Sequence, residues 1–222
     1  MKKLIHLILA FALLLSGCNS KPLSEFSEPS EGLSFTFDAA TDSYILSGIG
    51  SCTDEDIIIP PFYEGKPVTG IEEHAFWDVD FIKSVEIPNT ITKINVSSFF
   101  CRNLEKITIP DSITDIEPMK MKFSGRYTFA DISDEDAQYL SYNVYEDVRY
   151  LGSNTNPYHA LIAPIDYSRS TYTIHPDTKL IASCAFNNCE NLCRIEIPNG
   201  VTIIGAGSFE CHSLLTDITI PD

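Results

Sequence analysis

The stretch Ala185–Pro198, which reads A-F-N-N-C-E-N-L-C-R-I-E-I-P, decides the fold because its pattern occurs four times in the chain. Each copy begins with a small residue and a phenylalanine, and it ends with alternating apolar and polar residues closed by a proline. The other three copies run from Ala75 to Pro88, from Ser98 to Pro110 and from Ser208 to Pro221. Strand-closing prolines stand at 60, 88, 110, 176, 198 and 221, and the gap of 66 residues is three times 22. The repeat therefore keeps its register across the whole chain.

Each copy contains a short strand. Ile195 and Ile197 alternate with Glu196, which is the two-residue period of a strand with one buried and one exposed face. Pro198 then ends the strand because it has no N–H to donate. Upstream of the strand, each copy carries an aliphatic residue, a phenyl ring and a second aliphatic residue, as in Ile94, Phe99 and Leu104 or Ile181, Phe186 and Leu192. A unit of about 22 residues cannot bury such a face alone, so the copies must stack.

These copies resemble the BspA-type leucine-rich repeat, whose pattern runs roughly I-x-x-x-A-F-x-x-C-x-x-L-x-x-I-x-I-P. Cys189 stands at the cysteine position, while Cys101 and Cys211 stand one residue earlier and the first copy has no cysteine. The resemblance covers about residues 33–222. It implies a leucine-rich-repeat solenoid of mostly short β-strands, with turns, short helical segments and a β-rich N-terminal cap.

The N-terminus carries signals for export. Residues 1–17 have the features of a lipoprotein signal peptide, because two lysines precede an apolar run that is too short to span a bilayer comfortably. Leu15-Ser16-Gly17-Cys18 resembles the lipobox of bacterial lipoproteins, which implies lipidation of Cys18. An ordinary secreted protein with a cysteine at this position is the alternative. We expect a protein of the bacterial cell envelope, surface-exposed or facing the periplasm, that contacts the membrane through its lipid anchor only.

The rest of the chain divides into a tether, a cap and repeats. Residues 18–32 are rich in Ser, Glu and Pro, which is typical of a flexible tether. Residues 33–67 contain strand patterns and are expected to form the β cap over the first core. Residues 68–112 and residues 179–222 each hold two leucine-rich repeats. Residues 113–178 lack the Ala-Phe motif and form a modified repeat with a Tyr-rich insertion.

Within this insertion, Val148–Gly152 and Tyr158–Ala163 are expected to pair as two strands around a turn. Asp134–Leu140 is expected to form one or two helical turns. The chain ends at Asp222, directly after a strand and a proline, which indicates either an open stack or a truncated product. An uncovered last repeat exposes apolar surface and unpaired strand groups, and this predicts self-association.

Charge and motifs exclude several classes of function. The formal net charge of −16 argues against nucleic-acid binding and against docking on anionic lipid. The chain has no nucleophile motif, zinc-protease motif or phosphate-cradling glycine loop, so we expect no enzyme, no metal and no cofactor. Disulfides remain an alternative to free thiols for Cys52, Cys101, Cys184, Cys189, Cys193 and Cys211. The recurring position of three of these cysteines favours packed, free thiols.

Two sets of residues are candidates for binding a protein or another macromolecule of a cell surface. The first is Tyr139, Tyr142, Tyr145 and Tyr150, because tyrosine is enriched at binding surfaces; the alternative is that these rings pack over the insertion. The second is the outward-facing strand positions Glu86, Thr108, Glu196 and Thr219, with Lys83, Lys106 and Arg194 nearby. The family resemblance implies adhesion to host proteins or cells. An envelope scaffold or accessory lipoprotein that binds a bacterial partner is the alternative function.

Overall fold

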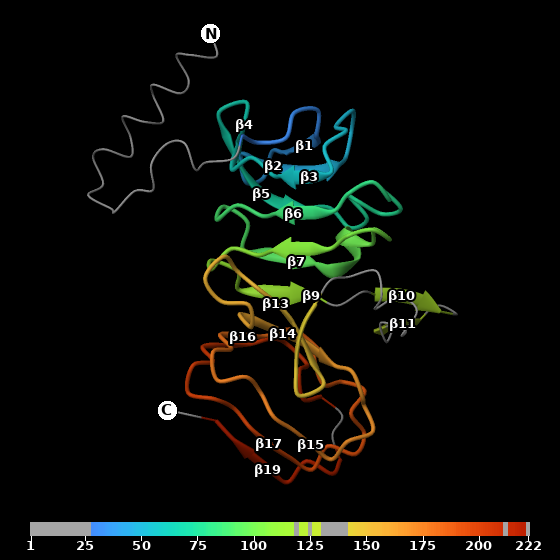
Figure 1. Cartoon of the computed structure of the whole chain (residues 1–222), viewed down its shortest axis with the longest axis vertical. Coiled ribbons are helices and arrows are strands. Elements are labelled where there is room, and N and C mark those ends of the chain that lie inside the picture. Colours follow the sequence, from blue (N-terminus) through green and yellow to red (C-terminus); the bar gives the residue numbers. More distant parts are fainter. Residues whose placement is uncertain (1–27, 118–119, 124–125, 130–141, 211–212, 221–222) are drawn as a thin grey trace, which may run out of the picture.

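The computed structural model describes residues 28–117, 120–123, 126–129, 142–210 and 213–220. They form a β-solenoid of about seven turns with almost no helix. The turns stack along one long axis in the order of the sequence, from β1 at one end to β19 at the other (Figure 1). The predicted leucine-rich-repeat solenoid is therefore confirmed.

The N-terminal end is covered by a four-stranded sheet with the strand order β1-β2-β5-β4. Its strands are β1 (Ser34–Asp38), β2 (Ser43–Gly48), β4 (Phe62–Tyr63) and β5 (Lys66–Ile71). The side chains of Leu46 and Val68 are fully buried and join the core of the first turns. The strands expected around Phe35–Phe37 and Tyr44–Leu46 are thus present, and their sheet packs on the core that the repeats build.

One side of the solenoid is a parallel ladder, which we call the first ladder. It consists of β3 (Asp56–Ile58), β6 (Ser84–Glu86) and β8 (Lys106–Thr108) and, beyond the insertion, of β15 (Thr171–Tyr172), β17 (Arg194–Glu196) and β19 (Asp217–Thr219). Ile57, Val85 and Ile107 align in register and are buried. β3 lies in the segment assigned to the cap, so the repeat ladder begins before residue 68.

A second set of short parallel pairs follows each proline turn, and sequence analysis did not predict these as strands. They are β7 (Lys93–Asn95) with β9 (Asp115–Glu117), and β16 (Leu180–Ile181) with β18 (Ile203–Ile204). A 3₁₀ helix, η2 (Val96–Phe99), follows β7, and the Asn95 side chain accepts a hydrogen bond from the Ser97 N–H at 3.0 Å. This one segment agrees with the expected short helical segments.

The insertion supplies further strands and keeps the stack continuous. They are β10 (Lys120–Phe123) with β11 (Arg126–Phe129), which lie beside the stack in Figure 1, and β12 (Asn143–Tyr145), β13 (Val148–Leu151) and β14 (Ala160–Pro164). β13 and β14 pair antiparallel, as predicted. The Ile109 N–H donates to the Gly152 carbonyl at 3.0 Å, and β14 pairs with β16. The insertion therefore takes the place of a regular turn.

Ladders of like side chains fill the interior, as the repeat pattern predicts. The rings of Phe76 and Phe99 lie 6.1 Å apart, and those of Phe186 and Phe209 stack at 5.3 Å. The Cys101 and Cys189 side chains are fully buried. Among the described cysteines none forms a disulfide, and Cys52, Cys101 and Cys189 are buried, which agrees with the packed-thiol interpretation for these three.

Several expectations fall on residues outside the described ranges. They are the signal peptide, Cys18, most of the tether, the helical turn at Asp134–Leu140, Tyr139 and Cys211. No helix among the residues that the structure describes is long and apolar enough to cross a membrane.

Candidate functional site

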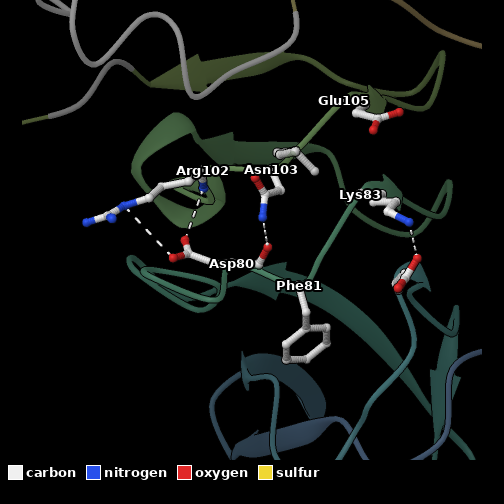
Figure 2. A pocket seen from close by; sticks show the side chains of 8 residues that line it. Asp80, Phe81, Lys83, Arg102, Asn103 and Glu105 are labelled. Carbon is white, nitrogen blue, oxygen red and sulfur yellow. Dashed lines mark hydrogen bonds and ion pairs between the residues drawn. The ribbon is translucent and has the colours of Figure 1, made fainter.

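A cavity of about 520 Å³ opens at the edge of the first ladder, beside β3, β6 and β8 (Figure 2). Its volume falls in the range of about 300–1,000 Å³ that is usual for ligand pockets. We call it the edge pocket. Its lining is Glu55, Asp80, Phe81, Lys83, Arg102, Asn103, Leu104 and Glu105.

The repeat places one wall of the edge pocket. Glu55, Lys83 and Glu105 each stand one residue before a strand of the ladder. The Lys83 N–H donates to the Glu55 carbonyl at 2.7 Å, and the Glu105 N–H donates to the Lys83 carbonyl at 2.7 Å. These bonds between neighbouring turns align the three residues into one column of alternating charge.

The opposite wall also comes from equivalent positions of two neighbouring turns. The Arg102 N–H donates to Asp80 Oδ1 at 3.3 Å, and Arg102 Nε lies 3.9 Å from Asp80 Oδ2. The Asn103 side-chain amide donates to the Asp80 carbonyl at 2.6 Å. Figure 2 shows the Asp80–Arg102 pair and Lys83 on opposite sides of Asn103. These side-chain and backbone interactions hold the two turns together, so this wall is formed before any ligand binds.

Charge and exposure decide what the edge pocket can recognise. Lys83 forms an ion pair with Glu55, and the hydrogen bond to this carboxylate raises the pKa of Lys83. Three carboxylates face two cations in the lining, which leaves one net negative charge. The Phe81 ring is 42% exposed, whereas the neighbouring Leu104 is buried. The pocket thus combines the exposed phenyl ring of Phe81 with charged and amide groups around it, which suits recognition of a polar side chain.

A second cavity of about 230 Å³ lies where the insertion meets the second set of strands. Its lining is Asp111, Ile113, His159, Lys179, Leu180, Thr202 and Ile203. The buried His159 ring has its Nδ1 3.5 Å from Asp111 Oδ1. Burial lowers the pKa of His159, against the opposite effect of Asp111, so the neutral ring is favoured. This cavity is small, and its His159–Asp111 contact serves to join the insertion to the preceding turn.

Of the four strand residues predicted to face outward, three are exposed and one is buried. Glu86 on β6, Glu196 on β17 and Thr219 on β19 are exposed, as predicted. Thr108 is only 7% exposed, so the prediction that it faces solvent is wrong. The residue paired with Thr108 in the next turn is Gly152 of the insertion, which forms a parallel bridge with it.

The tyrosines of the insertion mostly pack inside it. Tyr150 is fully buried and its Oη accepts a hydrogen bond from the His175 N–H at 3.1 Å, so the prediction of Tyr150 as a binding residue is wrong. Burial raises the pKa of Tyr150 to about 12. Tyr145 is half-buried and meets the His175 ring edge-on at 4.7 Å. Tyr142 is also half-buried, with its Oη enclosed. The structure thus favours the packing alternative for these rings.

The structure does not bring the predicted residues into one site, and sequence analysis did not single out Asp80, Phe81, Arg102 or Asn103 as a binding site. A signal was present in the repeat. Asp80 and Arg102 are 22 residues apart and opposite in charge, so stacking brings them together. Among the described residues, no group of three or more His, Cys, Asp or Glu could hold a metal ion.

The chain matches the sequence profile of the BspA type leucine-rich repeat region in six copies, over residues 51–153 and 166–222. No curated protein matches the chain significantly. Among solved structures, a leucine-rich-repeat protein of T. pallidum has 16% identity and a TM-score of 0.42, over 88% of this chain and 72% of that one. One from Bacteroides ovatus has 22% identity and a TM-score of 0.37, over 89% of this chain and 41% of that one. A leucine-rich cell surface protein of Faecalibacterium prausnitzii has 17% identity and a TM-score of 0.34, over 92% and 78%.

Proposed function

This chain belongs to the BspA-type leucine-rich-repeat family, whose members are often bacterial surface proteins, and on that premise we propose that it binds a macromolecular partner. The partner is a protein or another macromolecule of a host or bacterial surface, and adhesion is the role. The leucine-rich-repeat fold is typically a non-enzymatic scaffold. Stacked repeats provide an extended face with regularly spaced side chains, which suits recognition of a large ligand.

The observation that carries this proposal is the edge pocket. It joins three neighbouring turns at the first ladder, and its two walls are held by bonds between turns. Preformed walls lower the entropy lost when a partner binds. The exposed Phe81 ring supplies an aromatic anchor, and aromatic residues are enriched in the cores of interfaces.

Anchoring through Cys18 is part of the same proposal. Its support is the sequence Leu15-Ser16-Gly17-Cys18, which resembles a lipobox. Two acyl chains on this cysteine would give the two hydrophobic signals that stable anchoring needs. In cells that make the protein, Cys18→Ser is expected to release it from the membrane fraction, and a wild-type distribution for this variant would contradict anchoring.

The experiment that tests binding uses the full chain with Cys18→Ser, presented to arrays of matrix proteins, mucins and glycans and to whole cells. We expect a captured partner whose affinity falls about tenfold in Phe81→Ala, the cost typical of an interface anchor. Phe37→Ala is the matched control, because Phe37 is 45% exposed and lies in the cap. The control should bind like the parent chain.

Two outcomes would change the proposal. If no surface or cell component is captured at micromolar concentration, adhesion is wrong. If native envelope instead yields one stoichiometric bacterial partner, the alternative function as an envelope scaffold or accessory protein replaces it. For any partner that is captured, equal loss of binding in Phe81→Ala and Phe37→Ala would exclude the edge pocket as the contact site.

A further inference from the structure

We infer that the edge pocket takes a basic segment of the partner, with one Lys or Arg side chain lying against Phe81 and a second one beside Glu105, since the two residues point to opposite ends of the pocket (Figure 2). The inference rests on the proposed function and adds the chemistry of the ligand. It follows from three features of the lining, namely how its charges are paired, where its aromatic ring is exposed, and the charge of the surface around it.

The pairing of charges leaves one carboxylate for a ligand. Lys83 forms a hydrogen-bonded ion pair with Glu55, and Arg102 forms a longer ion pair with Asp80, with Nε 3.9 Å from Oδ2. Among the residues that the structure describes, neither cation lies within ion-pair distance of Glu105, although its field adds to the raised pKa of Lys83. Both cations of the lining are therefore engaged, and a cation is the complement of the remaining charge.

The ring of Phe81 supports the same ligand. It belongs to the lining and is 42% exposed, so one part of the ring is open to a partner. The face of an aromatic ring attracts an ammonium or guanidinium group, by about 0.5–1 kcal/mol at an exposed site. The aliphatic stem of a Lys or Arg side chain covers apolar surface while its head group remains in polar surroundings. A segment with two basic side chains thus matches both the ring and the carboxylate.

The surface around the pocket strengthens this preference. Beside the pocket-lining column two acidic residues are exposed, Asp56 on β3 and Glu86 on β6, against one cation, Lys106 on β8. The whole chain carries a formal net charge of −16. Such a field attracts basic partners over a distance and repels acidic ones, which speeds association and selects among partners.

The test is a titration of the ¹⁵N-labelled full chain with Cys18→Ser, followed by NMR. The probe is the peptide Gly-Ser-Arg-Gly-Arg-Ser-Gly, and the control is the same peptide with Gln in place of both Arg. We expect the Arg peptide to shift the amide signals of Phe81, Asn103 and Glu105, and the Gln peptide to leave them unchanged. Raising the salt from about 20 mM to about 200 mM should weaken binding, because exposed charges are screened.

Variants separate a specific ion pair from general attraction. Glu105→Gln should weaken binding of the Arg peptide about threefold, as for loss of an exposed ion pair. Glu190→Gln is the matched control, since it removes the same charge from an exposed position outside the edge pocket and should have no effect. Phe81→Leu should also weaken binding about threefold, because it removes the ring but keeps an apolar side chain.

Equal binding of the Arg and Gln peptides, or equal loss in Glu105→Gln and Glu190→Gln, would overturn the inference. Its failure differs from failure of the proposed function. A macromolecule whose capture depends on Phe81 but neither on salt nor on Glu105 would support the function and overturn the inference. Arg-peptide binding at the pocket without any captured macromolecule would support the inference and overturn the adhesive function.

Discussion

At the scale of single residues, Cys101 shows how a repeat position determines side-chain chemistry. The side chain is fully buried, and its Sγ donates a hydrogen bond to the Phe76 carbonyl at 3.0 Å. Burial raises the pKa of the thiol from 9.0 to about 12. The residue therefore acts as a small apolar side chain with one internal bond, and not as a nucleophile or a ligand.

We predict that Cys101 resists alkylation in the native protein. Because the thiolate is the reacting species, its fraction at pH 8 is lowered roughly a thousandfold by the raised pKa. The half-buried Cys184 and Cys193 should react first. Mass spectrometry of peptides after treatment with iodoacetamide measures this, and the protein unfolded in urea is the control in which all three residues react. Labelling of Cys101 at the rate of Cys193 in the native chain would contradict the prediction.

At the scale of elements, close approach between neighbouring turns limits the residues that β-strand ends can carry. The Gly205 N–H, just after β18, donates to the Ile181 carbonyl of β16 at 2.8 Å. A Cβ on Gly205 would lie 2.3 Å from the Ser183 backbone nitrogen. Neither backbone can move away without breaking this bond, so the position requires glycine.

Gly205→Ala is expected to lower the free energy of unfolding by about 2 kcal/mol or more, because overpacking against backbone forces the turns apart. Gly48→Ala is the control, since its new Cβ would be 3.6 Å from the nearest atom, the Ala75 carbonyl oxygen. Its effect should stay below about 1 kcal/mol. Urea unfolding of the two variants measures the difference. Equal stability would show that the two turns can move apart at little cost in free energy.

At the scale of the whole molecule, the core is divided along the stack. One cluster of buried side chains includes Phe99 and runs from the cap through the insertion to Ala182, and a second includes Phe186 and runs from Tyr150 of the insertion through the last turns. Each turn contacts only its neighbours, so stability is nearly a sum of local terms. The two ends of the solenoid should therefore open separately.

We predict that Phe186→Ala opens the C-terminal turns alone. Phe186 is fully buried and packs on Tyr172 and Phe209, so its loss should cost about 3–5 kcal/mol locally. Hydrogen exchange should quicken in β15, β17 and β19 and remain slow in β3 and β6. Phe99→Ala should give the reverse pattern. Faster exchange throughout both ends in either variant would show that the solenoid unfolds as one unit.

The sequence by itself determined the solenoid, because its signals are local. Ile195 and Ile197 alternate with Glu196 and are followed by Pro198, which together specify a short strand with one buried face and a fixed end. The phenylalanine of each copy recurs at a constant position, so stacking in register brings the rings together. Predicting them requires only the local pattern and the repeat length, and no information on which distant residues are in contact.

Only the tertiary structure decided which surfaces remain open. Thr108 has the pattern of an exposed strand residue, but it is buried where the chain pairs with Gly152 of the insertion, and Tyr150 is enclosed by segments that meet only after folding. The edge pocket likewise depends on hydrogen bonds between turns that align Glu55, Lys83 and Glu105. Exposure is set by which segments cover a residue, and those segments are separated along the chain by tens of residues, beyond the reach of a local pattern.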